Sequence, residues 1–496
     1  MPIHIPPILI PFDNTYARLP DRFYARVEPT RVAAPRLLRV NTALAEQLGI
    51  DPGSLGGSEA ADVFAGNAVP KGAEPIALAY AGHQFGGFSP QLGDGRAILL
   101  GEVVGRDGRR RDIQLKGSGP TPFSRRGDGR AALGPVLREY LVSEAMAALG
   151  IPTSRTLAAV ATGEEVVRET MLPGAVLTRV AASHIRVGTF QYFAGRSDIE
   201  AVQTLADYVI ARHYPDAAGA ETPYRALLDG VVARQADLVA QWVLVGFIHG
   251  VMNTDNTAIS GETIDYGPCA FMDAYDPAAV FSSIDQGGRY AYANQPRIAH
   301  WNLARLAEAL LPLLGDGQDA GLASAQEALA AFGPRFEAAY FGGLRRKVGL
   351  GTEQEGDTVL VQDLLTCMAE NAADFTLTFR RLCGAVAGPE GDDAVRTLFA
   401  DGGAYDGWAV RWRARSAAES VPPQARADAM RRVNPAIIPR NHLVEAALAA
   451  ALQDDLGPFE ALLDATAQPF EDRPGFEQYA LPPTQVDPSY RTFCGT

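Results

Sequence analysis

VGFIHGVMNTDNTAISGETIDYGPCAFMDAY, residues 245–275, joins an apolar segment to an unusual density of amide and carboxylate side chains. The apolar run 242–248 predicts the buried end of a helix that leads into a polar loop. Two short β-type segments follow, at 257–260 and 263–265, on either side of a Gly-Glu pair that is a two-residue hairpin signal. We therefore expect a loop and a hairpin that present oxygen atoms at one point.

The polar residues of this loop, Asn253, Asp255 and Asn256, add nothing to a hydrophobic core. Amide and carboxylate oxygens are the ligands that Mg²⁺ prefers, and the ion is usually held by one or two carboxylates plus substrate phosphates. The alternative is an ordinary polar turn in which these side chains cap the backbone. Both interpretations stay open from this stretch alone.

The same residues can be compared with the protein-kinase patterns H-R-D-x-x-x-x-N and D-F-G. His249 and Asn256 match the first pattern, but Val251 stands where the catalytic aspartate is expected. The tripeptide DYG at 265–267 corresponds to D-F-G, which makes Asp265 the second metal-ligand candidate. The metal-binding half of a kinase site is thus present without the usual base, which indicates a pseudokinase or an unusual transferase.

A strand lysine and a helix glutamate complete a kinase-type nucleotide site. The β-type segment 112–116 ends in Lys116, and a strongly helical segment, 135–149, carries two glutamates. Glu139 is our expected partner for the lysine and Glu144 is the alternative. A solvent-exposed helix glutamate with no such role is the third possibility.

Glycine and arginine are grouped at other positions suited to phosphate. GDGR at 93–96 stands between β-type segments, where glycine lets backbone N–H groups approach a phosphate, although a plain hairpin turn fits as well. RRGDGR at 125–130 forms a cationic loop suited to a phosphate or an acidic peptide, with a solvated charge run as the alternative. Arg179 and Arg186 follow near another β-type segment, and each alone is typical of a surface residue.

The whole chain divides into a β-rich first part and a helical second part. β-type runs are expected at 76–80, 96–104, 112–116, 155–160, 165–170 and 174–179, and helical signals at 36–48, 135–149, 223–251, 300–314, 324–341, 359–382 and 424–456. Ser324 with Glu327 suits a helix-capping box.

Composition restricts the classes of partner. The chain has 496 residues and a net charge of −14, which argues against nucleic acid as the main partner. No apolar run approaches the roughly 18 residues of a membrane helix, and the proline-rich N-terminus resembles no secretory signal. Four cysteines in so long a chain make no disulfide framework, so we expect a reducing, cytoplasmic setting.

The chain resembles the selenoprotein O family, also called YdiU. The resemblance is carried by YAGHQFGGFSPQLGDGRA, DIQLKGSGPTPFSRRGDGRAALGPVLREYL, LTRVAASHIRVGTFQYFA and HGVMNTDNTAISGETIDYGPCAFMDAY, and it extends to the terminal TFCGT. It implies a protein-kinase-like α+β bilobal fold with N- and C-terminal extensions. It also implies transfer of AMP from ATP, bound in a flipped orientation with Mg²⁺ (or Mn²⁺), to Ser, Thr or Tyr hydroxyls of proteins. UTP is a further possible donor.

The resemblance also implies a role for each matching residue. It places ATP at Gly93, Gly95, Arg96, Lys116, Asp128, Gly129, Arg179, Arg186 and Asp265, with Glu139 as the partner of the lysine. It makes Asp255 the proton acceptor, and Asn256 and Asp265 the metal ligands. The expected parts are an extension at 1–75, an N-lobe at 76–178, a C-lobe at 179–345 and a helical extension at 346–496.

Two cysteines suggest control by redox state. Cys269 follows the metal aspartate, and Cys494 stands where some eukaryotic members of the family carry selenocysteine. The family's redox associations imply an intramolecular Cys269–Cys494 disulfide, and two unrelated thiols are the alternative. Two other functions also stay open, namely a phosphotransferase and a non-catalytic nucleotide-binding pseudokinase.

Overall fold

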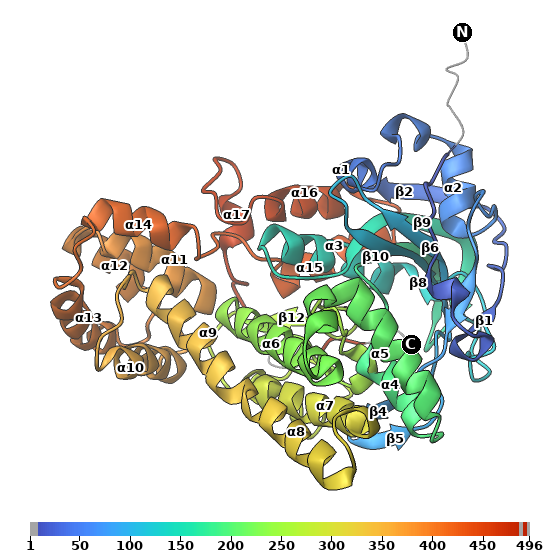
Figure 1. Ribbon diagram of the computed structural model, residues 1–496. Helices are drawn as coiled ribbons and strands as arrows, with labels where there is room; N and C mark the ends of the chain where they lie inside the picture. Colours follow the sequence, from blue (N-terminus) through green and yellow to red (C-terminus); the bar gives the residue numbers. More distant parts are fainter. Residues whose placement is uncertain (1–7, 486–489, 494–496) are drawn as a thin grey trace.

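The computed structural model describes residues 8–485 and 490–493, and it is built around one antiparallel sheet with helices beside it (Figure 1). The strand order is β1-β3-β6-β7-β10-β9-β2, and β8 pairs with β10. These strands are β1 (Tyr24–Arg26), β2 (Arg36–Val40), β3 (Ile76–Leu78), β6 (Ala97–Val104), β7 (Arg110–Lys116), β8 (Ala131–Ala132), β9 (Arg155–Val167) and β10 (Met171–Ala181). Two small antiparallel sheets pair β4 (Gly82–Gln84) with β5 (Gly87–Ser89), and β11 (Phe247–Ile248) with β12 (Ala270–Phe271).

Helices make up most of the second half of the chain. Along the described residues, the α-helices are α1 (Thr42–Gln47), α2 (Ser58–Ala65), α3 (Leu133–Ala148), α4 (Val187–Ala194), α5 (Ile199–His213), α6 (Pro223–Leu244), α7 (Gln295–Leu310), α8 (Gln318–Ala330), α9 (Phe332–Lys347), α10 (Asp357–Glu370), α11 (Phe375–Ala385), α12 (Asp392–Arg396), α13 (Gly402–Ser416), α14 (Pro423–Arg431), α15 (Asn441–Ala451), α16 (Gly457–Thr466) and α17 (Glu477–Ala480). This is the predicted α+β, kinase-like arrangement of a β-rich part followed by a helical part. Among the described residues, no helix has the length and apolar character needed to cross a membrane.

Most of the expected strands are confirmed, and so is the helix expected at 135–149, which is α3. The β-type runs expected separately at 155–160 and 165–170 form one long strand, β9. The helical signal at 36–48 is wrong in its first half, because residues 36–40 form β2 and pair with β9. Pairing with a strand more than 100 residues away overrides the local preference.

The hairpin expected at 257–265 is wrong. Ala258 pairs with Arg186, and Thr263 pairs with Thr153, so the two segments bridge to other parts of the chain and not to each other. The capping box expected at Ser324 is also wrong, since this serine lies inside α8. The single helix expected at 359–382 is two helices, because the Asp374 carboxylate caps a new start at α11 by accepting from Leu377 N.

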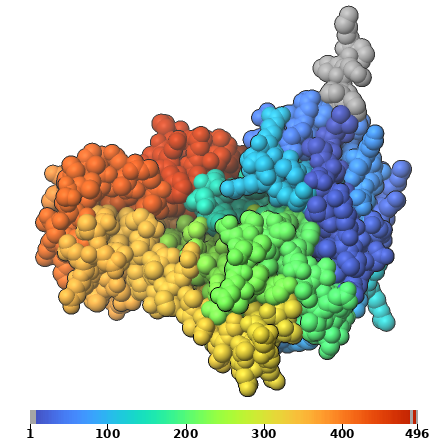
Figure 2. Space-filling view, in the orientation of Figure 1, coloured from blue at the N-terminus to red at the C-terminus, as the bar shows by residue number. Residues whose placement is uncertain are grey.

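The C-terminal helices lie in two places. Helices α10–α14 gather at one end of the molecule, coloured amber to orange, away from the blue N-terminal part (Figure 2), and share a hydrophobic core with α9 and β11. Helices α15 and α16 instead return to pack on α3, which also contacts β9 and β10 (Figure 1). The four expected parts of the chain stay a prediction, although the first 75 residues supply β1 and β2 to the main sheet.

Candidate active site

A buried ion-pair cluster forms where β7, β10 and α3 meet. Lys116 Nζ donates to Glu139 Oε2 at 2.6 Å, and Arg179 Nε donates to Glu139 Oε1 at 2.7 Å. The lysine and the arginine lie on neighbouring antiparallel strands, and Glu139 is 2% exposed. The predicted Lys116–Glu139 pair is therefore present. The alternative, Glu144, pairs with Arg155 at 2.5 Å instead.

The Asp265 carboxylate interacts with three cationic side chains. Arg179 Nη2 donates to its Oδ1 at 2.7 Å and Arg186 Nη1 to its Oδ2 at 3.1 Å, while Lys116 Nζ is 3.7 Å from Oδ1. Burial alone would raise the pKa of Asp265, but Arg179, Arg186 and Lys116 together hold it well below its usual range. The backbone of Asp265 has φ +63°, a left-handed conformation that is uncommon for a non-glycine residue.

Arg186 joins this cluster to the catalytic-type loop. The same Nη1 that bonds Asp265 also donates to the backbone oxygen of Asp255 at 2.7 Å. Its guanidinium lies 4.5 Å above the Tyr80 ring, a cation–π contact, and its Nε donates to His184 O. Arg179 and Arg186 are 2% and 3% exposed, so neither is the surface residue that its position in the sequence alone would suggest.

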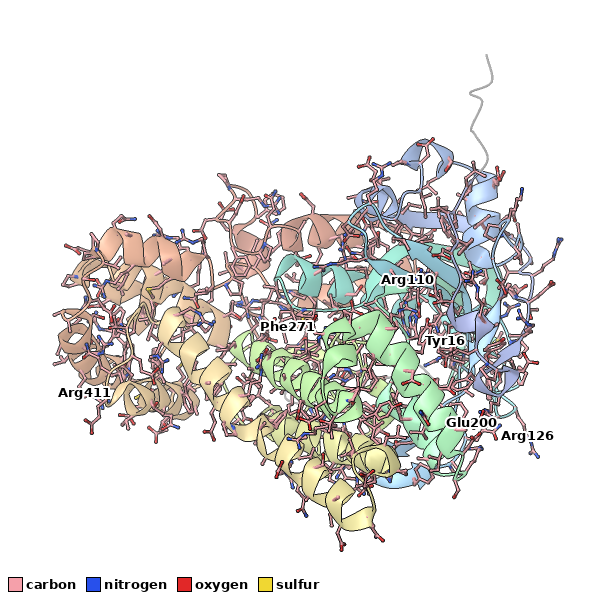
Figure 3. The ribbon with its side chains drawn as sticks, viewed as in Figure 1. Tyr16, Arg110, Arg126, Glu200, Phe271 and Arg411 are labelled. Atoms are coloured by element: carbon pink, nitrogen blue, oxygen red, sulfur yellow. The ribbon has the colours of Figure 1, made fainter. Side chains whose placement is uncertain are left out.

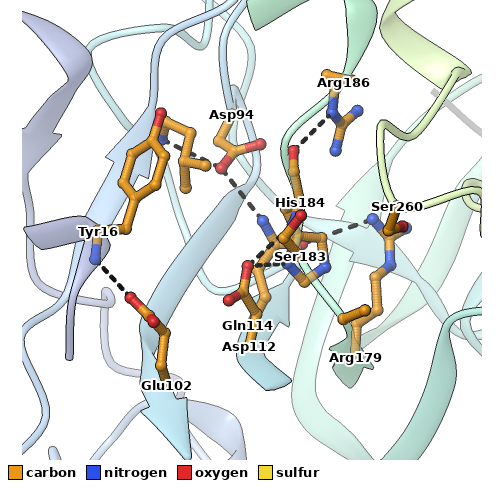
Figure 4. A network of polar contacts seen from close by, with 12 residues as sticks. Tyr16, Asp94, Glu102, Asp112, Gln114, Arg179, Ser183, His184, Arg186 and Ser260 are labelled. Carbon is orange, nitrogen blue, oxygen red and sulfur yellow. Dashed lines mark hydrogen bonds and ion pairs between the residues drawn. The ribbon is translucent and has the colours of Figure 1, made fainter. Parts of the chain in front are cut away.

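A second buried network of polar contacts lies beside these arginines (Figure 4). Asp112 Oδ2 accepts from the backbone N–H of His184 at 2.9 Å and lies 3.0 Å from its Nδ1. Asp94 Oδ2 accepts from Gln114 Nε2 at 3.1 Å. No local pattern in the sequence indicates these pairings, because the partners lie 20 to 72 residues apart.

The expected phosphate-binding glycines lie where backbone segments approach closely. A Cβ at Gly93 would stand 2.3 Å from the Phe123 ring, and one at Gly129 would stand 2.1 Å from Gly119 O. Both glycines also have positive φ, so any other residue would be strained there. The Gly119 N–H donates to Gly129 O, which holds this turn beside the end of β7.

The rest of the arginine-rich loop is exposed. Asp128 accepts from Arg168 Nη1 at 2.8 Å and from Arg130 N, so its described contacts do not join it to the central cluster. Arg126 extends from the edge of the molecule (Figure 3). Arg96 is half-buried, and its backbone oxygen accepts from Gly117 N just beyond Lys116.

Asp255 and Asn256 lie on a short 3₁₀ helix, Thr254–Asn256. Asp255 is 8% exposed, and burial, opposed by Arg186, raises its pKa to about 6. Gln84 Nε2 donates to Asp255 Oδ2 at 3.2 Å. His249 acts in support of the loop, since its Nε2 lies 2.9 Å from Ile264 O and its ring is buried.

The donor set at Asn256 and Asp265 fits a hard divalent cation. Asn256 Nδ2 donates to Val251 O at 2.9 Å, so the amide oxygen is the atom left for a ligand. Asp265 supplies a carboxylate whose pKa is held low. Among the described residues there is no group of three or more His, Cys, Asp or Glu that could hold a metal. Two oxygen ligands from the protein, completed by substrate phosphates, match the way proteins hold Mg²⁺.

The paired lysine and glutamate, the aspartate facing them and the kinase-like arrangement define a kinase-like enzyme. A family model described as "Protein adenylyltransferase SelO" matches residues 7–467. The protein nucleotidyltransferase YdiU from one strain of Methylorubrum extorquens is 66% identical over 495 residues, covering 98% of this chain and 99% of the relative. The protein nucleotidyltransferase YdiU of Bradyrhizobium diazoefficiens is 67% identical over 487 residues, with the same coverage. The chain belongs to this SelO/YdiU family of nucleotidyltransferases.

Proposed function

We propose that this protein transfers AMP from ATP to Ser, Thr or Tyr hydroxyls of other proteins and releases pyrophosphate. The observation that carries the proposal is the convergence of three cations, the partly buried Lys116 and the buried Arg179 and Arg186, beside Asp265 and next to Asp255. Three cations face two carboxylates in this cluster, Glu139 and Asp265. Ammonium and guanidinium groups gathered at one point suit the phosphate oxygens of a triphosphate.

The reaction exchanges one bond to phosphorus for another. The acceptor hydroxyl oxygen bonds to the α-phosphorus, and the bond from that phosphorus to the bridging oxygen breaks. Pyrophosphate leaves with the electron pair, and Asp255 takes the proton of the hydroxyl. Lys116, Arg179 and Arg186 offset the charge that builds up on the leaving pyrophosphate, which is where preorganised electrostatics contribute most to phosphoryl-type transfer.

Asp255 suits the role of proton acceptor because its pKa, raised to about 6, still leaves it ionised at neutral pH. Asn256 and Asp265 would hold the divalent cation, Mg²⁺ or Mn²⁺. The cation would supply charge neutralisation at the phosphate oxygens. Gly93, Gly95, Arg96, Asp128 and Gly129 complete the proposed ATP site, supported by the resemblance and by the close approach of backbone at Gly93 and Gly129.

Three finer statements belong to the same proposal. UTP is a second possible donor. A reducing, cytoplasmic setting is supported by the small number and wide spacing of the cysteines. A Cys269–Cys494 disulfide is supported by the docking of Thr492, whose Oγ1 donates to Pro268 O at 2.7 Å. Cys494 itself lies outside the described residues, so this pairing stays a proposal.

Labelled nucleotide distinguishes the three candidate functions. The protein is incubated with Mg²⁺ and ATP carrying label at either the α- or the γ-phosphate, and label is followed into protein and small-molecule fractions. We expect α-label in protein and none from γ-labelled ATP. Transfer of γ-label would indicate a phosphotransferase, and ATP binding without transfer would indicate a pseudokinase. Asp265→Ala should abolish α-label transfer, and full activity of this variant would refute the metal assignment.

A further inference from the structure

The hairpin formed by β4 and β5, residues 82–89, contacts the catalytic loop. The hairpin comes from the first part of the chain, yet two of its backbone N–H groups reach the loop at 253–256. His83 N donates to Thr254 Oγ1 at 2.7 Å, and Phe85 N donates to Asn253 Oδ1 at 3.1 Å. Phe85 has φ +51°, an uncommon conformation for a bulky residue, and this turn aims its N–H at the loop.

Between these two backbone contacts lies a side-chain contact to the proposed proton acceptor. Gln84 Nε2 donates to Asp255 Oδ2 at 3.2 Å. Asp255 Oδ1 is buried and has no hydrogen-bond partner among the described residues. It lies against Gly82, where an added Cβ would stand 2.5 Å from it. The hairpin thus contacts both oxygens of the carboxylate. Gln84 bonds to Oδ2, and the glycine at position 82 leaves the space that Oδ1 fills.

This arrangement decides which way the carboxylate faces. An ionised carboxylate has about four lone-pair sites, two on each oxygen. Gln84 occupies one site on Oδ2, and Oδ1 is buried against Gly82, where an added Cβ would stand 2.5 Å from it. Because both sites on Oδ1 are buried, the second site on Oδ2 is the one that we assign to the proton. A base must lie within hydrogen-bond reach of the proton that it removes, so an orientation fixed before the acceptor binds favours the reaction.

We propose that Gln84 is a positioning residue for the transfer reaction, and that Gly82 and Gln84 together hold Asp255 in its productive orientation. The inference rests on the proposed function, because it takes Asp255 as the proton acceptor. The opposite interpretation of the same contacts is that the hairpin is an inhibitory cover over Asp255. Removal of the Gln84 contact should lower kcat if the hairpin positions Asp255, and should raise kcat if the hairpin covers it.

The central experiment measures α-label transfer to casein, and to the enzyme itself, by full-length Gln84→Ala and Gln84→Glu variants. We expect kcat to fall about tenfold or more in both, since a hydrogen bond to a charged group is lost. KM for ATP should stay within about twofold, because Gln84 makes no described contact with the Lys116 cluster. Gln84→Glu keeps the size of the side chain but exchanges the donor for a second carboxylate, so a packing role alone would leave it active.

Gln47→Ala is the matched control. Gln47 Nε2 donates to Asp107 Oδ2, also at 3.2 Å, at the exposed turn between β6 and β7. This variant loses the same kind of contact far from the loop, and we expect the kcat of the parent. Unchanged or increased kcat in Gln84→Ala, or equal losses in Gln47→Ala and Gln84→Ala, would overturn the proposal.

A double-mutant cycle tests whether Gln84 acts through Asp255. In the Asp255→Ala background, Gln84→Ala should cost no more than about twofold, because the group that it orients is gone. A full, additive loss in that background would mean that Gln84 acts elsewhere, and would overturn the proposal. Gly82→Ala should lower kcat with Gln84 intact, and normal kcat in that variant would also contradict the proposal. If the parent itself transfers no α-label, the proposed function fails first and this inference with it.

Discussion

At Glu139 one buried carboxylate binds two cations, since it accepts from Lys116 and from Arg179. Burial alone would raise the pKa of Glu139, but Arg179 and Lys116 together hold it below its usual range. Removing one member of a buried ion-pair group leaves uncompensated charge, which costs about 3–5 kcal/mol. The role of Glu139 is thus both structural and electrostatic, and the two effects can be separated by comparison with a glutamate on the same helix.

We predict that Glu139→Ala lowers α-label transfer at least about 100-fold and destabilises the protein, because Lys116 and Arg179 lose their shared partner. Glu144→Ala is the control on α3. Glu144 pairs with Arg155, which is 31% exposed, so its loss should cost stability but leave transfer within about fivefold. Urea unfolding and the labelling assay measure the two quantities. Similar transfer rates in the two variants would contradict the assignment.

The residues proposed as base and as metal ligands should differ in how much activity is lost when each is removed. General-base assistance is typically worth about 10²–10⁴-fold, while loss of charge neutralisation affects the whole triphosphate. We therefore predict that Asp255→Ala retains more α-label transfer than the double variant Asn256→Ala/Asp265→Ala. The assay is run with enough enzyme to detect the residual rate of each. Equal residual rates in the two proteins would refute the ranking.

At the scale of elements, the local sequence pattern predicted those strands and helices whose structure depends on residues nearby in the sequence. The register of β6 with β7 follows from a short polar turn, and α3 follows from its apolar spacing and the glycine after it. Residues 36–40 and 257–265 were mispredicted because their partners, β9, Arg186 and Thr153, are distant in sequence. Such pairings depend on the assembled sheet, which no local window contains.

Some contacts of the candidate site could likewise be predicted from the sequence, and others could not. Lys116 and Glu139 could be paired from sequence, because a strand lysine followed by a helix glutamate is a repeated arrangement. Gln84 could not be predicted as a partner of Asp255, since 171 residues separate them and a polar hairpin residue has no distinctive pattern. The only available signal was its place in the stretch YAGHQFGG, which resembles the family without indicating a role.

The end of α9 offers a pH-dependent prediction. Lys347 is 3% exposed and its Nζ lies 4.4 Å from the centre of the Phe379 ring in α11. Burial, opposed only by nearby Cys383, lowers the pKa of Lys347 to about 7. The pKa in the unfolded chain is about 10.4, so the folded state disfavours the charged form. The stability of the parent is therefore full above about pH 10.4, and it is lost progressively as the pH falls from there to about 7.

Lys347→Met keeps the length of the side chain and removes the charge. We predict that it raises the free energy of unfolding by roughly 2–4 kcal/mol at about pH 6 and by much less at about pH 9.5. Urea unfolding at the two pH values measures the difference. Lys71→Met, at an exposed lysine, is the control and should show no such pH dependence. An equal gain at both pH values would show that packing, and not the charge, sets the effect.

At the scale of the whole molecule, α3 links the sheet to the C-terminal helices. It contacts β9 and β10 as well as α15 and α16 (Figure 1). Arg138 forms an ion pair with Glu445 of α15, and the Tyr140 ring meets the Phe459 ring edge to face, 5.7 Å between centres. The residue between Arg138 and Tyr140 is Glu139. The C-terminal helices therefore support the helix that holds Glu139, although they lie far from Asp255 in sequence.

This support predicts a long-range effect on ATP binding. Phe459→Ala removes a ring that is 1% exposed, so it should cost about 3–5 kcal/mol of stability. It should also raise the Kd for ATP about three- to tenfold, because α3 loses its outer packing and Glu139 its fixed position. Phe399→Ala is the control: Phe399 is 6% exposed in the core that α10–α14 share with α9 and β11, and that core contains no residue of α3. We expect a comparable loss of stability in Phe399→Ala with an unchanged Kd for ATP.

Calorimetric titration with ATP and Mg²⁺, at a temperature where both variants are folded, measures the affinity. Equal Kd values in the two variants would show that the C-terminal helices stabilise the protein without positioning its site.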